Sequence, residues 1–217
     1  LSSNIGLGVA LGTSAFGKTE SNKQSRVNPA PGGIITPEKI TPLRIAIVGV
    51  GVRGTEFIHI LLNLEGCQVT AVCDIEEYKV ANAQKIVKEK GLPQPKGYCR
   101  SETDFKRLCQ QEDVDLVIAA TPVQWHVPVC VEAMKNGKHS ATEVHATYKL
   151  DECWELVEAC EKYNKQCCLL ENYCYIRNVM MVLKMARRGL LGELVFSEAG
   201  YQHDVRNVRF GDDGQLL

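Results

Sequence analysis

The sequence predicts an α/β fold with a doubly wound parallel sheet, followed by the truncated start of a second α+β domain. Three observations lead to this prediction. Apolar runs typical of buried strands alternate with helical patterns from residue 44 onward. The first run passes through a glycine turn into a helix, and the second run ends in an aspartate. Strands alternating with helices favour parallel pairing with right-handed crossovers.

The first strand, turn and helix carry the most specific signal in the chain. The apolar run Ile45–Val48 precedes Gly49, Gly51 and Gly54, which have the spacing G-x-G-x-x-G, and a helical apolar pattern runs from residue 57 to 64. Gly49 permits a tight turn, Gly51 lets the backbone approach a pyrophosphate, and Gly54 lets the helix pack closely on the strand. Free N–H groups at the helix start favour a diphosphate.

The second strand ends in Asp74, 23 residues after Gly51. A carboxylate there can accept hydrogen bonds from both ribose hydroxyls of a dinucleotide and repels a 2′-phosphate, which favours NAD(H) over NADP(H). Arg53 acts against this preference, because it could pair with a phosphate. The glycine spacing alone would be weak evidence, and the alternative is a glycine-rich turn that binds nothing. With its strand, helix and acid, it predicts a Rossmann-type nucleotide site.

The remaining elements continue the alternation as far as residue 172. Gly91 and Gly137 are predicted to end helices, and Asp151 is predicted to cap one. The predicted helices are 76–90, 104–111, 127–136 and 152–164, and the predicted strands are 97–99, 115–120, 139–143 and 167–172. Beyond them, a helix over 179–188 and a strand over 194–201 should open the second domain.

Polar and aromatic residues collect where the predicted strands end. In a parallel sheet these carboxyl ends share one edge, where ligands bind. For any one of these residues, a capping or loop-packing role is about as plausible as ligand contact, but their clustering favours a site. The strand ends carry Gly49, Asp74, Thr121 to His126, Glu143 to His145, and Asn172. His59, in mid-helix, is instead predicted to be a surface or packing residue.

Composition excludes several classes of protein. The 217 residues carry a net charge of −1, which gives no reason to expect nucleic acid as a partner, and no apolar run is long enough to span a membrane. None of the ten cysteines forms a C-x-x-C pair, so we expect no metal site. Most cysteines are interpreted as small buried side chains with free thiols, and Cys153 and Cys160 would share the apolar face of one helix.

The chain divides into four predicted parts. Residues 1–17 resemble the remnant of an export signal, with a frayed N-terminal tail as the alternative. Residues 18–43 read as a linker, 44–172 as the NAD-binding domain, and 173–217 as the incomplete start of a C-terminal substrate domain. We therefore expect an exported protein, periplasmic or lipid-anchored outside the cytoplasm, and otherwise a cytoplasmic one.

Two groups of motifs carry a resemblance to a known family. Ile47-Val-Gly-x-Gly-x-x-Gly, Asp74, Thr121-Pro-x-x-x-His126 and Glu143 resemble the N-terminal domain of the Gfo/Idh/MocA superfamily of NAD(P)-dependent oxidoreductases. Within that superfamily, the NAD-dependent α-N-acetylgalactosaminidases have motifs similar to the segments 171–177, 189–195 and 200–204. The resemblance covers about residues 43 to 210. An export signal is usual in that glycosidase family.

The resemblance implies a redox-neutral glycosidase reaction with tightly bound NAD⁺. The sugar would be oxidised at C3, the aglycone would leave by elimination, water would add, and the hydride would return. Two carboxylates are then not needed. Cofactor contacts would come from the glycine turn with Val52 and Arg53, and from Asp74, Thr121, Val123, Gln124, Trp125, His126, Glu143, Val144 and Asn172. Tyr201 would contact the sugar, and Tyr175 and His203 are catalytic candidates, with structural roles as the alternative.

One departure separates the chain from the superfamily's dehydrogenases. Those enzymes usually follow the matching glutamate with Lys-Pro, whereas Glu143 is followed by Val144-His145. The glycosidases also lack this lysine, although they have a small residue where His145 stands. The alternatives are an NAD-dependent sugar or polyol dehydrogenase and a non-catalytic nucleotide-binding protein. We expect a sugar or glycan as substrate and homo-oligomers as on related folds. The 217-residue chain should hold NAD weakly without turning over substrate.

Overall fold

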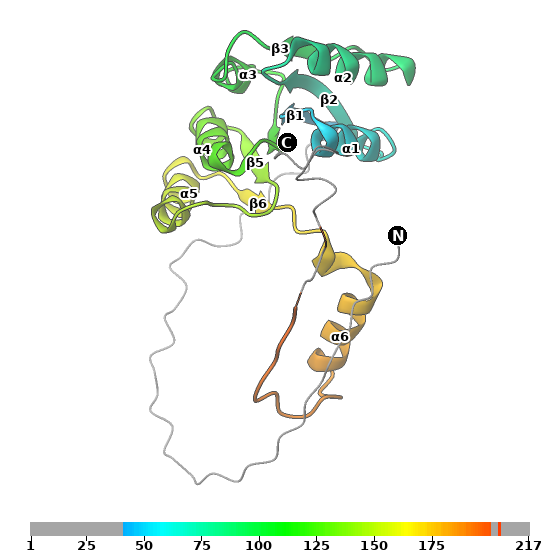
Figure 1. Ribbon diagram of the computed structural model, residues 1–217, viewed down its shortest axis with the longest axis vertical. Helices are drawn as coiled ribbons and strands as arrows, with labels where there is room; N and C mark the ends of the chain where they lie inside the picture. Colours follow the sequence, from blue (N-terminus) through cyan, green and yellow to red (C-terminus); the bar gives the residue numbers. More distant parts are fainter. Residues whose placement is uncertain (1–40, 201–203, 205–217) are drawn as a thin grey trace. The chain divides into compact units, whose positions relative to one another are not determined.

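The computed structural model describes residues 41–200 and residue 204. The predicted export segment, most of the predicted linker, Tyr201 and His203 lie outside the described residues. The described chain falls into two compact units, one ending at Tyr175 and the other beginning at Ile176. The first unit contains the sheet and five α-helices among its described residues (Figure 1).

Six parallel strands form one sheet in the order β3-β2-β1-β4-β5-β6. Their bounds are Leu43–Val48 (β1), Cys67–Cys73 (β2), Lys96–Tyr98 (β3), Leu116–Ala119 (β4), His139–Thr142 (β5) and Cys167–Leu169 (β6). The chain builds outward from β1 to β3 and then returns to the other side of β1 with β4. This reversal leaves a crevice at the carboxyl ends of β1 and β4, where doubly wound folds bind their ligands.

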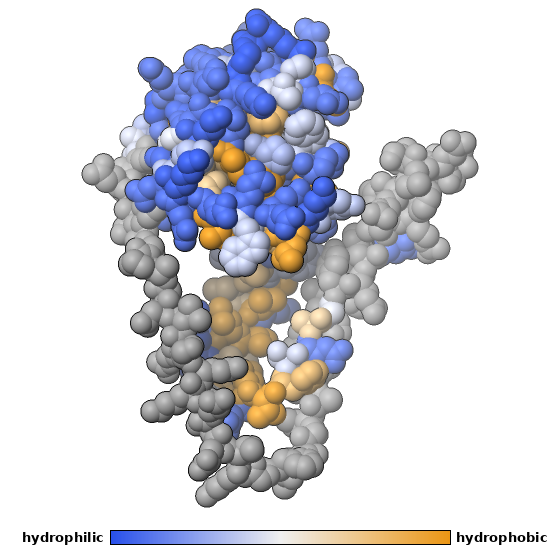
Figure 2. Space-filling model, turned by 90° about the vertical axis from the view of Figure 1, so that its left-hand side faces the viewer, coloured by the Kyte–Doolittle hydropathy of each residue, from blue (hydrophilic) through white to orange (hydrophobic). Residues whose placement is uncertain are grey.

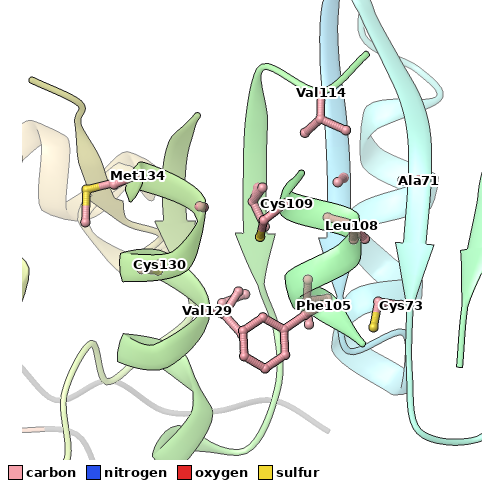
Figure 3. Close-up of a cluster of buried hydrophobic side chains, with 14 of the residues drawn as sticks. Ala71, Cys73, Phe105, Leu108, Cys109, Val114, Val129, Cys130 and Met134 are labelled. Carbon is pink, nitrogen blue, oxygen red and sulfur yellow. The ribbon is translucent and has the colours of Figure 1, made fainter. Parts of the chain in front are cut away.

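Helices cover both faces of the sheet. Along β1, Ile45 and Ile47 face one core and Ala46 and Val48 face the other, as the two-residue period of a strand requires. The first core is shared with α1 (Val52–Leu61) and α2 (Glu77–Glu89). The second is shared with α3 (Phe105–Cys109), α4 (His126–Lys135) and α5 (Leu150–Tyr163), and Figure 3 shows part of it. The predicted doubly wound parallel sheet is confirmed.

Two sequence predictions about elements were wrong. Asp151 does not cap α5, because the helix begins at Leu150 and Asp151 lies inside its first turn. The backbone N–H groups of Tyr148 and Lys149 donate instead to Glu152 at 2.7 and 3.0 Å. This carboxylate satisfies N–H groups that would otherwise lack partners at the helix start. Of the ten cysteines only Cys73, Cys109 and Cys130 are buried, so the interpretation of most cysteines as buried side chains is wrong.

The second unit contains α6 (Arg177–Arg187), and its described residues 194–200 form no strand. The predicted strand over 194–201 is therefore not formed in its described part. A strand needs a partner for its backbone hydrogen bonds, and no described segment pairs with these residues. Figure 2 shows a largely hydrophilic surface with separate hydrophobic patches on the sheet unit. No helix within residues 41–200 is long and apolar enough to cross a bilayer.

Candidate cofactor site

The glycine turn after β1 is closely packed on one side and open on the other. Gly49 has a φ of +85°, and a Cβ there would lie 2.6 Å from the carbonyl oxygen of Ala120. A Cβ on Gly54 would overlap the Gly49 carbonyl, because α1 crosses directly over the turn. A Cβ on Gly51 would meet no atom within 4 Å. The open side at Gly51 is where a ligand can approach the backbone.

The start of α1 favours an anion. Gly51 is its N-cap, no side chain caps the helix, and its first turn holds no acidic residue. The first N–H groups of a helix have no partner within the helix, and together with the helix dipole they attract negative charge. Arg53 also stands in this first turn, where its guanidinium is paired with Glu56 and Glu143. A diphosphate therefore suits this end of α1.

Asp74 connects the end of β2 to the glycine turn. Its Oδ2 accepts the Val50 N–H at 2.9 Å, and its Oδ1 accepts the Glu76 N–H at 3.1 Å. The Nζ of Lys79 lies 3.9 Å from Oδ1. The carboxylate is thus held in place at the crevice. Lys79 was not identified from the sequence, although a basic residue five positions after the acid could have been examined as a charge partner.

An ion pair joins α1 to the loop after β5. Arg53 donates from Nε to Glu143 Oε1 at 2.7 Å and from a terminal nitrogen to Glu56 Oε2 at 2.9 Å. Hydrogen bonding to Glu56, and then to Glu143, raises the pKa of the guanidinium. Glu143 Oε2 accepts the Val144 N–H at 3.1 Å. Two residues predicted separately as cofactor contacts, 90 positions apart, therefore meet.

His126 ties two loops of the same edge together. Its side chain is 2% exposed, and its ring nitrogens lie 2.8 Å from the carbonyl oxygen of His145 and 2.9 Å from that of Thr121. The imidazole thus faces backbone on both sides. Before it, Val123–Trp125 forms a 3₁₀ turn, η1, and Trp125 packs edge-on against Phe105 with ring centres 5.9 Å apart. The hydrogen bonds of His126 and the packing of Trp125 against Phe105 therefore hold the loop after β4 in place.

A cavity of about 110 Å³ opens between the ends of β1, β2 and β4. Whole-ligand pockets measure about 300–1,000 Å³, so this cavity can accept one end of a dinucleotide. The buried hydroxyl of Thr121, at its wall, has no partner among the described residues. Burial raises the pKa of the neighbouring Cys73 thiol to about 12, which keeps it protonated. The cavity is lined among others by Gly49, Asp74, Ile75, Ser101, Thr121 and Trp125.

Several lining residues were missed by sequence reasoning. Ser101, Glu102 and Phe105 follow β3, the one strand end that was not included in the predicted site. The same rule about strand ends would have found them. Five residues of the predicted site do not line this cavity and are exposed instead: Val52, Gln124, Val144, Asn172 and Tyr175.

These features fit a dinucleotide. The open backbone at Gly51, the unpartnered Thr121 hydroxyl and the anion-favouring start of α1 are what such a ligand needs. Within residues 41–200 and at 204, no group of three or more His, Cys, Asp or Glu side chains is placed to hold a metal ion. Fold and site together define a dinucleotide-binding Rossmann domain.

Comparison with known families agrees. The profile of the Gfo/Idh/MocA family, described as an oxidoreductase family with an NAD-binding Rossmann fold, matches residues 43–171. The chain belongs to this family, and its cofactor is NAD. Residues 175–217 match a second profile, the C-terminal domain of glycosyl hydrolase 109.

Two curated relatives of this chain are named as glycosidases. An α-N-acetylgalactosaminidase from Bacteroides fragilis is 40% identical over 173 residues, which is 80% of this chain and 40% of that protein. A glycosyl hydrolase family 109 protein from Shewanella pealeana is 37% identical over 184 residues, 85% of this chain and 40% of that protein. The chain thus spans about two-fifths of the length of the curated relatives it matches.

Solved structures with the same fold include two dehydrogenases. The WlbA dehydrogenase from Chromobacterium violaceum, in complex with NADH and UDP-GlcNAcA, has a TM-score of 0.62 at 24% identity and covers 73% of this chain and 44% of its own. An apo scyllo-inositol dehydrogenase from Lactobacillus casei has a TM-score of 0.62 at 18% identity, with coverage of 72% and 44%. These likenesses show the fold.

Proposed function

We propose that this chain is the NAD-binding part of a glycoside hydrolase that acts on α-linked N-acetylgalactosamine or a related sugar. The observation that carries the proposal is the order of the two matches. An NAD-binding domain over residues 43–171 is followed directly by the start of a glycosyl hydrolase 109 C-terminal domain over 175–217. Relatives at 37–40% identity, named as members of that glycosidase family or as its α-N-acetylgalactosaminidase, support the same activity.

Bound NAD would supply a reversible hydride acceptor for C3 of the sugar, and this chain's residues would hold and orient it. The start of α1 and Arg53 would face the diphosphate, and Asp74 would accept the hydroxyls of the adenosine ribose. Glu143, fixed by Arg53, would lie with Val144 at the nicotinamide end.

The loops would supply the remaining contacts. The η1 turn would pass the ribose or nicotinamide, and Asn172 would hold the nicotinamide end. Tyr201 would contact the sugar. Tyr175 and His203 are proposed near the reacting atoms, where an imidazole suits proton abstraction.

The main alternative is an NAD-dependent sugar or polyol dehydrogenase of the same family. The solved structures that are named as dehydrogenases have the same fold as this chain. Against it stands the segment after Glu143, which reads Val144-His145 here, whereas the resemblance implies Lys-Pro at this place in most dehydrogenases of the superfamily. A non-catalytic nucleotide-binding protein would bind NAD without turnover of any sugar.

The deciding experiment uses the full-length parent protein with its bound cofactor and no added nucleotide. An aryl α-N-acetylgalactosaminide is supplied, and phenol release and NADH absorbance are followed together. We expect phenol release without NADH accumulation. NADH formed from free sugars plus NAD⁺, with no phenol release, would establish the dehydrogenase instead. Absence of both, with NAD still bound, would establish the non-catalytic protein.

We also propose that the parent protein is exported. The support is the run of apolar and small residues from 5 to 17, which resembles the hydrophobic part of a signal peptide. In a bacterial host, the parent protein should appear outside the cytoplasm, and deletion of residues 1–17 should retain it inside. Cytoplasmic location of the intact parent would contradict the proposal.

A further inference from the structure

Arg53 joins the start of α1 to the loop after β5 through its ion pair with Glu143. Its Nε donates to Glu143 Oε1 at 2.7 Å, a terminal nitrogen donates to Glu56 Oε2 at 2.9 Å, and the guanidinium carbon lies 4.7 Å from the ring centre of Phe57. The strands that lead to Arg53 and Glu143, β1 and β5, are separated by β4. The pair therefore spans the edge of the sheet at which a dinucleotide binds.

These side chains place excess negative charge beside the start of α1. Arg53 carries one positive charge, whereas Glu56 and Glu143 each carry a negative one. The Glu143 side chain is only 16% exposed, so solvent screens its charge less than that of the exposed Glu56. A diphosphate brings further negative charge to the same place. It gains little attraction from Arg53 while two carboxylates neutralise the guanidinium.

Glu143 has a second hydrogen bond that does not depend on Arg53. Its Oε2 accepts the Val144 N–H at 3.1 Å, which holds the carboxylate at the loop after β5. A partly buried carboxylate that loses its cation is destabilised unless other donors replace it. NAD offers both replacements, because its diphosphate is an anion for Arg53 and its nicotinamide half carries O–H and N–H donors for Glu143. ADP offers the diphosphate alone.

We propose that the Arg53–Glu143 pair is exchanged when NAD binds. Arg53 leaves Glu143 and pairs with the diphosphate, and Glu143 accepts hydrogen bonds from the nicotinamide half instead. This inference rests on the contacts proposed above, which assign Arg53 to the diphosphate and Glu143 to the nicotinamide end. A ligand without the nicotinamide half leaves Glu143 without a replacement for its cation. The exchange therefore selects a whole dinucleotide over ADP.

The test measures the affinity of the 217-residue chain for ADP and for NAD by calorimetry, in Glu143→Gln, Arg53→Gln and the double variant. We expect Glu143→Gln to raise the affinity for ADP several-fold, because Arg53 no longer has to leave a carboxylate. The ratio of NAD to ADP affinity should fall about tenfold, because the nicotinamide half loses a charged acceptor. In the Arg53→Gln background, Glu143→Gln should change the affinity for ADP much less.

A second variant, Glu143→Asp, keeps the negative charge and shortens the side chain by one CH₂, which breaks the 2.7 Å contact with Arg53. The affinity for ADP should again rise, whereas a mere loss of repulsion predicts no change. This variant also answers the question if circular dichroism shows that Glu143→Gln does not fold.

The matched control is Glu132→Gln. Glu132 is 17% exposed and lies 3.9 Å from Lys135 near the end of α4, away from the crevice, so both affinities should stay unchanged.

Two results would overturn the exchange alone. An equal gain in ADP affinity with and without Arg53 would show a simple loss of repulsion. Unchanged or lower ADP affinity in Glu143→Gln and Glu143→Asp would show that Arg53 binds the diphosphate without leaving Glu143. A third result, unaltered ADP and NAD affinity in Arg53→Gln, would refute the proposed diphosphate contact together with the exchange.

Discussion

At the scale of single residues, the glycines of the turn differ in what a methyl group would meet. A Cβ on Gly54 would overlap the Gly49 carbonyl, whereas a Cβ on Gly51 would enter open space. The sequence motif gives both positions the same letter, but one glycine serves helix packing and the other serves ligand approach. A substitution at Gly54 should therefore lower stability, whereas one at Gly51 should weaken ligand binding.

We predict that Gly54→Ala lowers the free energy of unfolding by about 1–3 kcal/mol, because the added methyl group forces the backbone to move. Gly51→Ala should leave the melting temperature nearly unchanged and weaken NAD binding at least tenfold, because the methyl group occupies the approach of the pyrophosphate. Thermal melts and NAD titrations of both variants test this pair. Unimpaired NAD binding by Gly51→Ala would show that the diphosphate does not pass over this residue.

Asp74 should set both affinity for NAD and discrimination against NADP. The substitution Asp74→Asn removes a charged hydrogen-bond acceptor. Because hydrogen bonds to charged groups contribute about 1.5–3 kcal/mol, the affinity for NAD should fall about 10- to 100-fold. NADP should lose much less, because its 2′-phosphate is no longer repelled and Lys79 lies nearby. Isothermal titration with both nucleotides measures the ratio.

The control for Asp74→Asn is Asp113→Asn. Asp113 pairs with Lys96 at 3.0 Å, at the opposite edge of the sheet, so its loss should leave both affinities unchanged. An unaltered NAD to NADP ratio in Asp74→Asn would remove Asp74 from the ribose site.

At the scale of elements, three hydrogen bonds between one pair of residues join β1 to the residue that precedes β4. Asp115 accepts from the backbone N–H and Nε of Arg44, both at 2.9 Å, and from its terminal nitrogen at 2.6 Å. Hydrogen bonding from the Arg44 side chain lowers the pKa of Asp115. The folded state therefore binds fewer protons than the unfolded state in the acidic range, and stability rises with pH there.

This contact gives a pH-dependent prediction. Its contribution is fully present above the unfolded carboxyl pKa of about 3.9 and is lost as pH falls through the lower folded value. Asp115→Asn should lower the melting temperature at pH 7 and flatten its fall between about pH 5 and pH 2. Glu89→Gln, which breaks an exposed pair with Lys85 on α2, is the control and should change little. Identical acid slopes for Asp115→Asn and the parent would contradict the assignment.

The sequence predicts most helices and strands of the sheet unit, and it fails where an element depends on a contact with a distant or unexpected partner. The apolar periods placed each strand of the sheet and each covering helix within a few residues. The predicted strand at 194–201 failed in its described part because a strand depends on a partner that local sequence does not contain. The start of α5 moved to Leu150 because Glu152 reaches back to two N–H groups, a contact that is available to any acid near a helix start.

At the scale of the whole molecule, the division into two units locates the cofactor site within one of them. Every described residue predicted to contact NAD lies at or before Asn172, and the first unit ends at Tyr175. We predict that residues 41–175 alone fold and bind NAD within about threefold of the 217-residue chain, a difference of less than about 1 kcal/mol. Circular dichroism and NAD titration of the shortened chain test this, and a tenfold loss would show that residues after 175 contribute.

The sequence by itself determined the parallel sheet, the glycine turn and the acid at the end of β2. These features depend on periodicity and on residue types at fixed local spacing, which can be seen without a structure. Only the tertiary structure decided that Arg53 meets Glu143 and that His126 faces two backbone carbonyls. Each of these contacts joins different elements, and its existence depends on strand order and register, which no local pattern specifies.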